Sequence, residues 1–159
     1  MLRQPVITAA LVVLGLTAPL AAETAPQDVA FAEDGSVADP LTDASGNADD
    51  GAAIYADRSS GNCVACHAIS DRTDADFQGN IGPSLDGAGD RWEVAQLRGI
   101  VADAKHTFPE SMMPSFYKTT GYIRPGDAYT GKAGTEPLPP LLSGQQIEDV
   151  VAYLATLKE

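Results

Sequence analysis

The chain has 159 residues, and its formal net charge at neutral pH is −12. Such an acidic chain repels the phosphates of nucleic acids, which argues against nucleic-acid binding and indicates that any charged partner presents a basic surface. The length suits one small domain with a modest apolar core of its own.

Residues 1–22 have the pattern of a secretory signal peptide. Arg3 gives a positive start, residues 6–16 are apolar, and the segment ends on small residues at Ala22. A permanent membrane anchor is the alternative, but a spanning helix needs about 20 apolar residues and this stretch is shorter. We therefore expect cleavage after Ala22, export to the periplasm and no membrane anchor. The mature chain would carry a formal charge of −13, because Arg3 is lost.

Residues 23–48 contain many small and polar residues and few large apolar ones. Such a segment cannot bury enough apolar surface to offset the entropy that it loses on ordering. We expect a flexible N-terminal segment or a loosely docked arm, followed by one folded domain at 49–159.

Three helices are predicted in this domain, at 49–60, 91–103 and 144–158. Asp90 can cap the second helix, and Ser143 with Gln146 makes a capping-box pattern at the start of the third. The third helix also carries an apolar stripe at helical spacing, formed by Ile147, Val150, Val151, Leu154 and Leu157.

Residues 114–142 hold five prolines and four glycines, which favour a long loop over helix or sheet. No convincing alternating strand pattern appears elsewhere. The sequence therefore predicts an all-α domain with long loops.

Cys63-Val64-Ala65-Cys66-His67 is a C-x-x-C-H motif, the attachment pattern of c-type haem. Each cysteine thiol adds to one haem vinyl group, and two intervening residues give the sulfurs the spacing that the porphyrin edge requires. His67 follows at once, so its imidazole meets the iron on one axial side. Together with an export signal, the motif predicts one covalently bound haem c held by Cys63 and Cys66, with His67 as an iron ligand.

Three other interpretations of the two cysteines are weaker. A redox-active C-x-x-C pair needs a βαβ context, which the sequence does not show. A zinc site needs four ligands, whereas the chain has two cysteines and two histidines, with His106 in a different segment. A disulfide between Cys63 and Cys66 closes a very small loop and leaves His67 without a role.

The second axial position of the iron has three candidate ligands, namely Met113, Met112 and His106 in order of preference. His/Met ligation suits an electron-transfer haem, because a thioether sulfur favours the reduced iron and raises the potential. Met113 is preferred because Pro114 follows it, and a fixed proline φ restrains the loop. The other methionine would then fill an irregular gap in the core.

Four segments of the chain resemble the SoxX family of sulfur-oxidation cytochromes. They are residues 61–67, 79–85, 112–117 and 142–154, and the resemblance spans about 50–159. The haem motif alone is common to c-type cytochromes. The sequences GNIGPSL and MMPSFY, together with the last helix, make the resemblance specific.

The resemblance implies a class I cytochrome c fold, in which the first and last helices cross near the haem edge. It gives Gly51 a role in the close approach of these helices, with Tyr55 and Tyr153 packed beside it. It also implies that the Pro83 carbonyl accepts a hydrogen bond from the second ring nitrogen of His67, which would fix the orientation of the ring.

SoxX proteins pair with the haem subunit SoxA, and the SoxAX complex oxidatively joins thiosulfate to a cysteine of the SoxYZ carrier. The catalytic, cysteine-ligated haem of that family belongs to SoxA. The resemblance therefore implies a monohaem, non-catalytic electron-transfer subunit that meets SoxYZ through SoxA and passes electrons to a small diffusible cytochrome. The alternative is a free-standing periplasmic electron shuttle.

The loop 114–142 also holds tyrosines and basic residues, namely Tyr117, Tyr122, Arg124, Tyr129 and Lys132. Tyrosine and arginine are enriched in the cores of protein interfaces. We hypothesise that this loop helps to form the contact with SoxA; a plain surface loop is the alternative.

Overall fold

The computed structural model describes residues 22–126 and 130–159, so all of the predicted signal peptide except Ala22 lies outside the described residues. The helices of the described part are α1 (Ala48–Ala56), α2 (Ala88–Arg91), α3 (Val94–Asp103) and α4 (Gly144–Thr156), with 3-10 turns η1 (Pro26–Asp28), η2 (Cys63–Ala65) and η3 (Ala104–His106). Within these residues the only β-structure is two isolated bridges, which confirms the all-α class. None of the helices described here has the length and apolar character that crossing a membrane requires.

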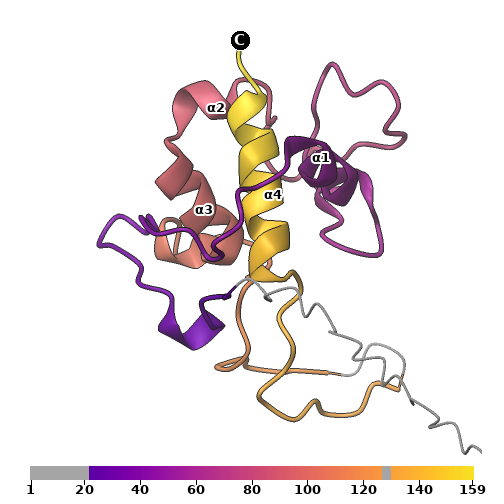
Figure 1. Cartoon of the computed structure of the whole chain (residues 1–159). Coiled ribbons are helices and arrows are strands. Elements are labelled where there is room, and N and C mark those ends of the chain that lie inside the picture. Colours follow the sequence, from indigo (N-terminus) through magenta and orange to yellow (C-terminus); the bar gives the residue numbers. More distant parts are fainter. Residues whose placement is uncertain (1–21, 127–129) are drawn as a thin grey trace, which may run out of the picture.

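Helix α4 occupies the centre of the domain, with α1 on one side and α2 and α3 on the other (Figure 1). Helices α1 and α4 meet at Gly51, where a Cβ atom would lie 2.6 Å from the carbonyl carbon of Asp149 and 2.8 Å from Cβ of Tyr153. Only glycine allows this approach, because any side chain at position 51 would overlap the α4 backbone. The close crossing of the first and last helices is therefore confirmed.

The limits of α1 and α4 follow from their caps. Ser143 Oγ accepts a hydrogen bond from the N–H of Gln146 at 3.2 Å, and the N–H of Ser143 donates to Gln146 Oε1 at 2.9 Å, so the predicted capping box is confirmed. α4 ends two residues before the predicted limit of 158. α1 stops at Ala56 instead of 60, because Asp57 has an extended backbone and turns the chain away.

The predicted start of the second helix is wrong. α3 begins at Val94, and Glu93, not Asp90, is its N-cap and forms a capping box with Gln96. Asp90 instead lies in the short helix α2, where its carboxylate accepts from the N–H of Glu159 at 2.8 Å and pairs with Lys158 at 3.2 Å. The spacing in the sequence predicts Asp90 as a helix cap, but in the fold its carboxylate is bonded by Lys158 and Glu159 instead.

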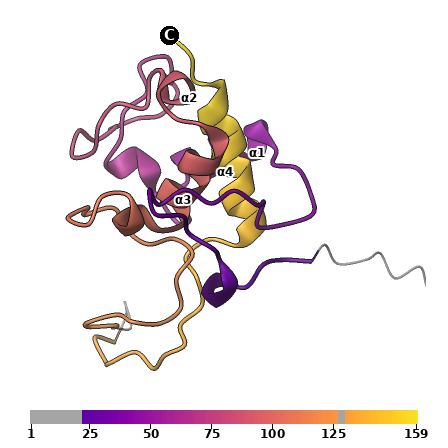
Figure 2. The ribbon, with the colours of Figure 1, turned by 90° about the vertical axis from the view of Figure 1, so that its left-hand side faces the viewer.

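Residues 29–46 pack against α3 and α4 as a docked arm, the second of the two forms expected from composition, and the packing is tight. Val37 and Leu41 are 3% and 1% exposed and belong to the main apolar core. Arg98 of α3 and Glu148 of α4 form a buried ion pair at 2.7 Å, and both residues also bond the backbone of the arm. Arg98 Nη1 donates to the Val37 carbonyl at 2.8 Å, and the N–H of Leu41 donates to Glu148 Oε1 at 2.8 Å. Figures 1 and 2 show this arm running across the helices. A few apolar anchors and one ion pair between helices suffice to order it.

Candidate haem site

The C-x-x-C-H motif lies on the turn η2. Asn62 enters the turn with a left-handed backbone (φ 51°), and Val64, only 2% exposed, anchors it in the core. The N–H of His67 donates to the Cys63 carbonyl at 2.9 Å and closes the turn. Both cysteines are half-buried thiols that form no disulfide, and burial raises the pKa of Cys63 to about 11. The turn therefore brings two thiols and an imidazole together.

The imidazole of His67 is oriented by a backbone carbonyl. Its Nδ1 lies 2.7 Å from the carbonyl oxygen of Pro83, as the resemblance implies. Because a carbonyl oxygen can only accept, Nδ1 is the donor in this contact, which leaves Nε2 as the ring nitrogen that could ligate a metal. Gly82 packs on the same ring: a Cβ there would lie 2.6 Å from Nδ1 and 2.8 Å from Nε2, and closer still to Cε1.

The segment that supplies Pro83 lies alongside the haem motif. The backbone bonds are Gly79 N to Val64 O (2.8 Å), Gly82 N to Cys66 O (2.8 Å) and Leu85 N to Ala68 O (2.9 Å). Gly79 is required for this approach, because a Cβ there would lie 2.5 Å from the carbonyl carbon of Ala65. The pairing fixes the Pro83 carbonyl relative to the imidazole that it orients.

Polar contacts hold the far end of the same segment. Asp86 accepts hydrogen bonds from the N–H and Oγ of Ser70 at 2.8 and 2.6 Å and from Oγ of Ser84 at 2.8 Å. These bonds, led by the one from the Ser70 side chain, lower the pKa of Asp86. Arg91 donates to the carbonyls of Ser84 (3.0 Å) and Asp86.

Sequence reasoning missed a second support for His67. Tyr55 donates its hydroxyl proton to the His67 carbonyl at 2.9 Å, and burial raises the pKa of Tyr55 to about 12, so the hydroxyl stays protonated. Gln78 Oε1 lies 2.8 Å from that hydroxyl and also accepts from the N–H of Ile69 at 2.6 Å. Arg72 lies over the rings of Tyr55 and Tyr153, at 5.7 and 5.9 Å. No spacing in the sequence signals Gln78 or Arg72.

The three candidate distal ligands differ in their surroundings. Met113 is partly buried and packs against the main core, whereas the side chain of Met112 is 81% exposed. The ring of His106 stacks on Phe31 of the N-terminal arm, with centroids 3.8 Å apart and planes 9° from parallel. The two methionines therefore have distinct environments, and His106 contacts the arm.

The residues of this site fit a covalently bound haem. Two free thiols sit on one turn, Nε2 of His67 is available to the iron, and Ile81, next to Gly82, offers an apolar side chain that is 67% exposed. In the described part of the chain, no group of three or more His, Cys, Asp or Glu side chains is placed to hold a metal ion, so the zinc interpretation gains no support.

Comparisons with known proteins agree with this geometry. The cytochrome c family model matches residues 48–158. The crystal structure of SoxXA from P. pantotrophus contains a similar chain, with 58% sequence identity and a TM-score of 0.83, covering 86% of this chain and 99% of that one. The search of curated proteins gives no match.

The chain therefore belongs to the cytochrome c family, whose members bind haem c covalently. The similarity to the SoxXA chain confirms the resemblance to SoxX that the sequence motifs carry.

Proposed function

We propose that this chain is the monohaem electron-transfer subunit of a periplasmic SoxAX-type complex, with a SoxA-type haem protein as its partner. The observation that carries the proposal is the 58% identity to a chain of SoxXA over 99% of that chain's length. The complex would act when thiosulfate is oxidatively joined to a cysteine of the SoxYZ carrier. Residues 1–22 would direct export and then be cleaved, so the N-terminal sequence of the mature protein should begin at Glu23.

The chemistry assigned to this chain is electron relay. Joining thiosulfate to a cysteine thiolate forms a sulfur–sulfur bond and releases two electrons, which a haem carries one at a time. Cys63 and Cys66 would hold the haem and His67 would ligate its iron, so neither cysteine remains for sulfur chemistry. Catalysis would take place on SoxA, which would also bind the SoxYZ carrier. A small diffusible cytochrome would accept the electrons from the haem of this chain.

We assign Met113 as the distal iron ligand. Its partly buried position against the core supports this choice over Met112, whose side chain is 81% exposed. Met113→Ala should abolish the weak absorption band at about 700 nm that marks sulfur ligation of ferric haem. Met112→Ala is the matched control and should keep the band. The reverse outcome would move the ligand to Met112.

The partner surface proposed here is formed by residues 119–126 and 130–138 of the 114–142 loop, which lie side by side as a hairpin closed by a hydrogen bond from Leu138 N to Thr119 O at 2.8 Å. Gly134 N donates to Pro125 O at 2.7 Å. The hairpin extends away from the helices (Figures 1 and 2). These two backbone hydrogen bonds hold the described part of the hairpin together.

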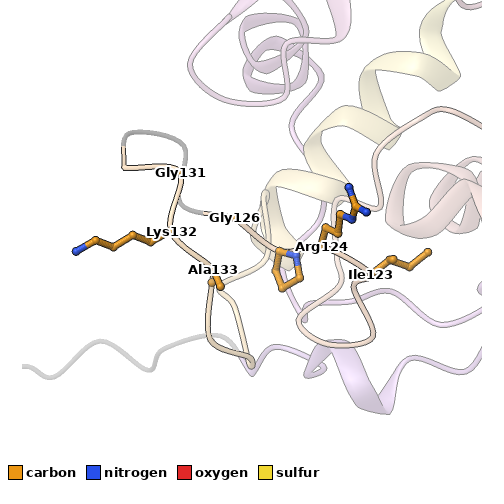
Figure 3. Close-up of a pocket in the computed structure, with 8 residues that line it drawn as sticks. Ile123, Arg124, Gly126, Gly131, Lys132 and Ala133 are labelled. Atoms are coloured by element: carbon orange, nitrogen blue, oxygen red, sulfur yellow. The ribbon is translucent and has the colours of Figure 1, made fainter.

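The side chains of the hairpin suit a protein partner. Ile123 is 97% exposed, and it points the opposite way from Lys132 (Figure 3). Residues 114–142 carry three basic and two acidic side chains in a chain of net charge −12, so this region suits an apolar and acidic surface on SoxA. Tyr117 does not belong to this surface, because it is buried and its hydroxyl bonds Glu23 and Thr24; Tyr129 lies outside the described residues.

Two measurements test the proposed function. Co-expressed SoxA should co-purify with this chain, and Ile123→Asp should weaken the pairing by about tenfold or more. Val94→Asp, at a 47% exposed position on α3, is the control that should leave it intact. Thiosulfate with SoxYZ should then reduce the haem of this chain only when SoxA is present. A lone monomer with no haem-bearing partner in sulfur-grown cells would favour the free-standing shuttle instead.

A further inference from the structure

The segment that carries Met113 is tethered at every second residue to the C-terminal end of α3 and to the turn η3 that follows it. The tethers are Lys105 Nζ to Met113 O (2.6 Å), Ser115 Oγ to Asp103 Oδ1 (2.7 Å) and Tyr117 N to Ala102 O (2.9 Å). Ser115 and Tyr117 are buried, so the last two tethers belong to the core. The Lys105 tether is the one next to the methionine side chain.

The main chain at Met113 depends on side-chain partners. Pro114 has no N–H, so the peptide after Met113 offers only the Met113 carbonyl for hydrogen bonding. That carbonyl accepts from the ammonium of Lys105, while the N–H of Met113 donates to Ser111 Oγ at 3.2 Å. A hydrogen bond from a charged donor is stronger than a neutral one. Lys105 therefore supplies the charged hydrogen bond to this peptide, from a solvent-exposed side chain.

Lys105 is itself held in place by the fold. It lies in η3, directly after α3, and its N–H donates to Asp103 Oδ1 at 3.2 Å. The next residue, His106, stacks on Phe31 of the N-terminal arm at 3.8 Å. The arm, η3 and the methionine segment thus form a continuous chain of contacts.

We propose that Lys105 is a positioning residue for the distal haem ligand. By holding the Met113 carbonyl, it restrains the main chain from which the thioether extends, and it sets how readily that thioether gives way to another ligand. This inference rests on the proposed assignment of Met113. The loss of the tether should leave the haem attached but make the sixth coordination position easier to open.

Imidazole binding to the mature ferric holoprotein measures this restraint directly, because imidazole must displace the methionine. Lys105→Leu removes the charge and the donor without adding a possible iron ligand, and it should tighten the apparent imidazole affinity by about tenfold. Lys105→Arg keeps a cationic donor and should restore the affinity of the parent. The matched control is Lys158→Leu, because the ammonium of Lys158 also bonds a backbone carbonyl, that of Gly89, away from the methionine segment.

A double-mutant comparison separates positioning from general loosening. In a Met113→Ala background the Met113 thioether no longer competes, so adding Lys105→Leu should leave imidazole affinity unchanged. An affinity in Lys105→Leu within twofold of the parent, or an equal change in Lys158→Leu or in the Met113→Ala background, overturns the role of Lys105. A parent protein that lacks the band at about 700 nm overturns the methionine assignment itself, which is a different result.

Discussion

Gly82→Ala is expected to displace the imidazole of His67. The new Cβ would lie 2.6 Å from Nδ1 and 2.8 Å from Nε2, whereas nonbonded atoms pack at about 3.5 Å. The ring cannot retreat freely, because Nδ1 is bonded to the Pro83 carbonyl at 2.7 Å, and in the holoprotein Nε2 would be held by the iron. The new methyl group would therefore push the imidazole away from the Pro83 carbonyl or from the iron.

The magnitude follows from these two effects. Overpacking of this kind costs about 1–3 kcal/mol, and a site restrained on both sides lies at the upper end. Loss of the hydrogen bond to Pro83 adds about 1 kcal/mol. The sum, about 4 kcal/mol, is a large part of the stability of a small domain.

The assay combines the ferric absorption spectrum with a denaturant titration of the holoprotein. Gly82→Ala should keep the covalent haem but shift the spectrum toward high spin and lower the unfolding midpoint. Gly126→Ala, where the nearest atom to a new Cβ is the Lys132 carbonyl oxygen at 3.8 Å, is the control for the glycine-to-alanine change. Pro83→Ala keeps the accepting carbonyl and should keep the spectrum. A Gly82→Ala protein with the spectrum and midpoint of the parent would refute the reasoning.

Three further predictions concern the scaffold. Gly51→Val should cost more than about 3 kcal/mol in a urea titration, since a Cβ there would lie 2.6 Å from the Asp149 carbonyl carbon; an unchanged midpoint contradicts the close helix approach. Glu148→Gln should cost about 3–5 kcal/mol, because it leaves the Arg98 guanidinium buried beside a neutral group, and a loss below about 1 kcal/mol contradicts this. Hydrogen bonds lower the pKa of Asp86, so its stabilisation is present above the unfolded pKa of about 4 and is lost as pH falls through the lower folded value. In the Asp86→Asn variant, the melting temperature should therefore fall less steeply than in the parent as the pH is lowered below about 4. A melting temperature that falls with the same slope as in the parent contradicts the pKa shift.

Local signals made some elements predictable from sequence. The capping box of Ser143 and Gln146 lies within one turn of the helix that it starts, and the apolar stripe after it has helical period, so α4 was located to within two residues. The haem motif is equally local, because the chemistry fixes both the spacing of its cysteines and the position of His67.

The missed features depend on residues far apart in the chain. The arm at 29–46 is ordered by Arg98 and Glu148, which come from different helices and meet only in the fold. Asp90 has the right spacing for a cap, yet the C-terminal residues bond it instead. Gln78 is a single polar residue in a loop. Its side chain contacts Tyr55 and Ile69, but one residue of this kind produces no repeating pattern in the sequence that could predict these contacts.

The central claim is one haem bound covalently at Cys63 and Cys66. Intact mass spectrometry of the denatured, exported chain tests it most directly, read together with the pyridine haemochrome spectrum. The account predicts a mass greater than that of the polypeptide by one haem and a c-type spectrum, both lost when Cys63 and Cys66 are replaced by alanine. A colourless protein with the mass of the bare polypeptide would contradict it.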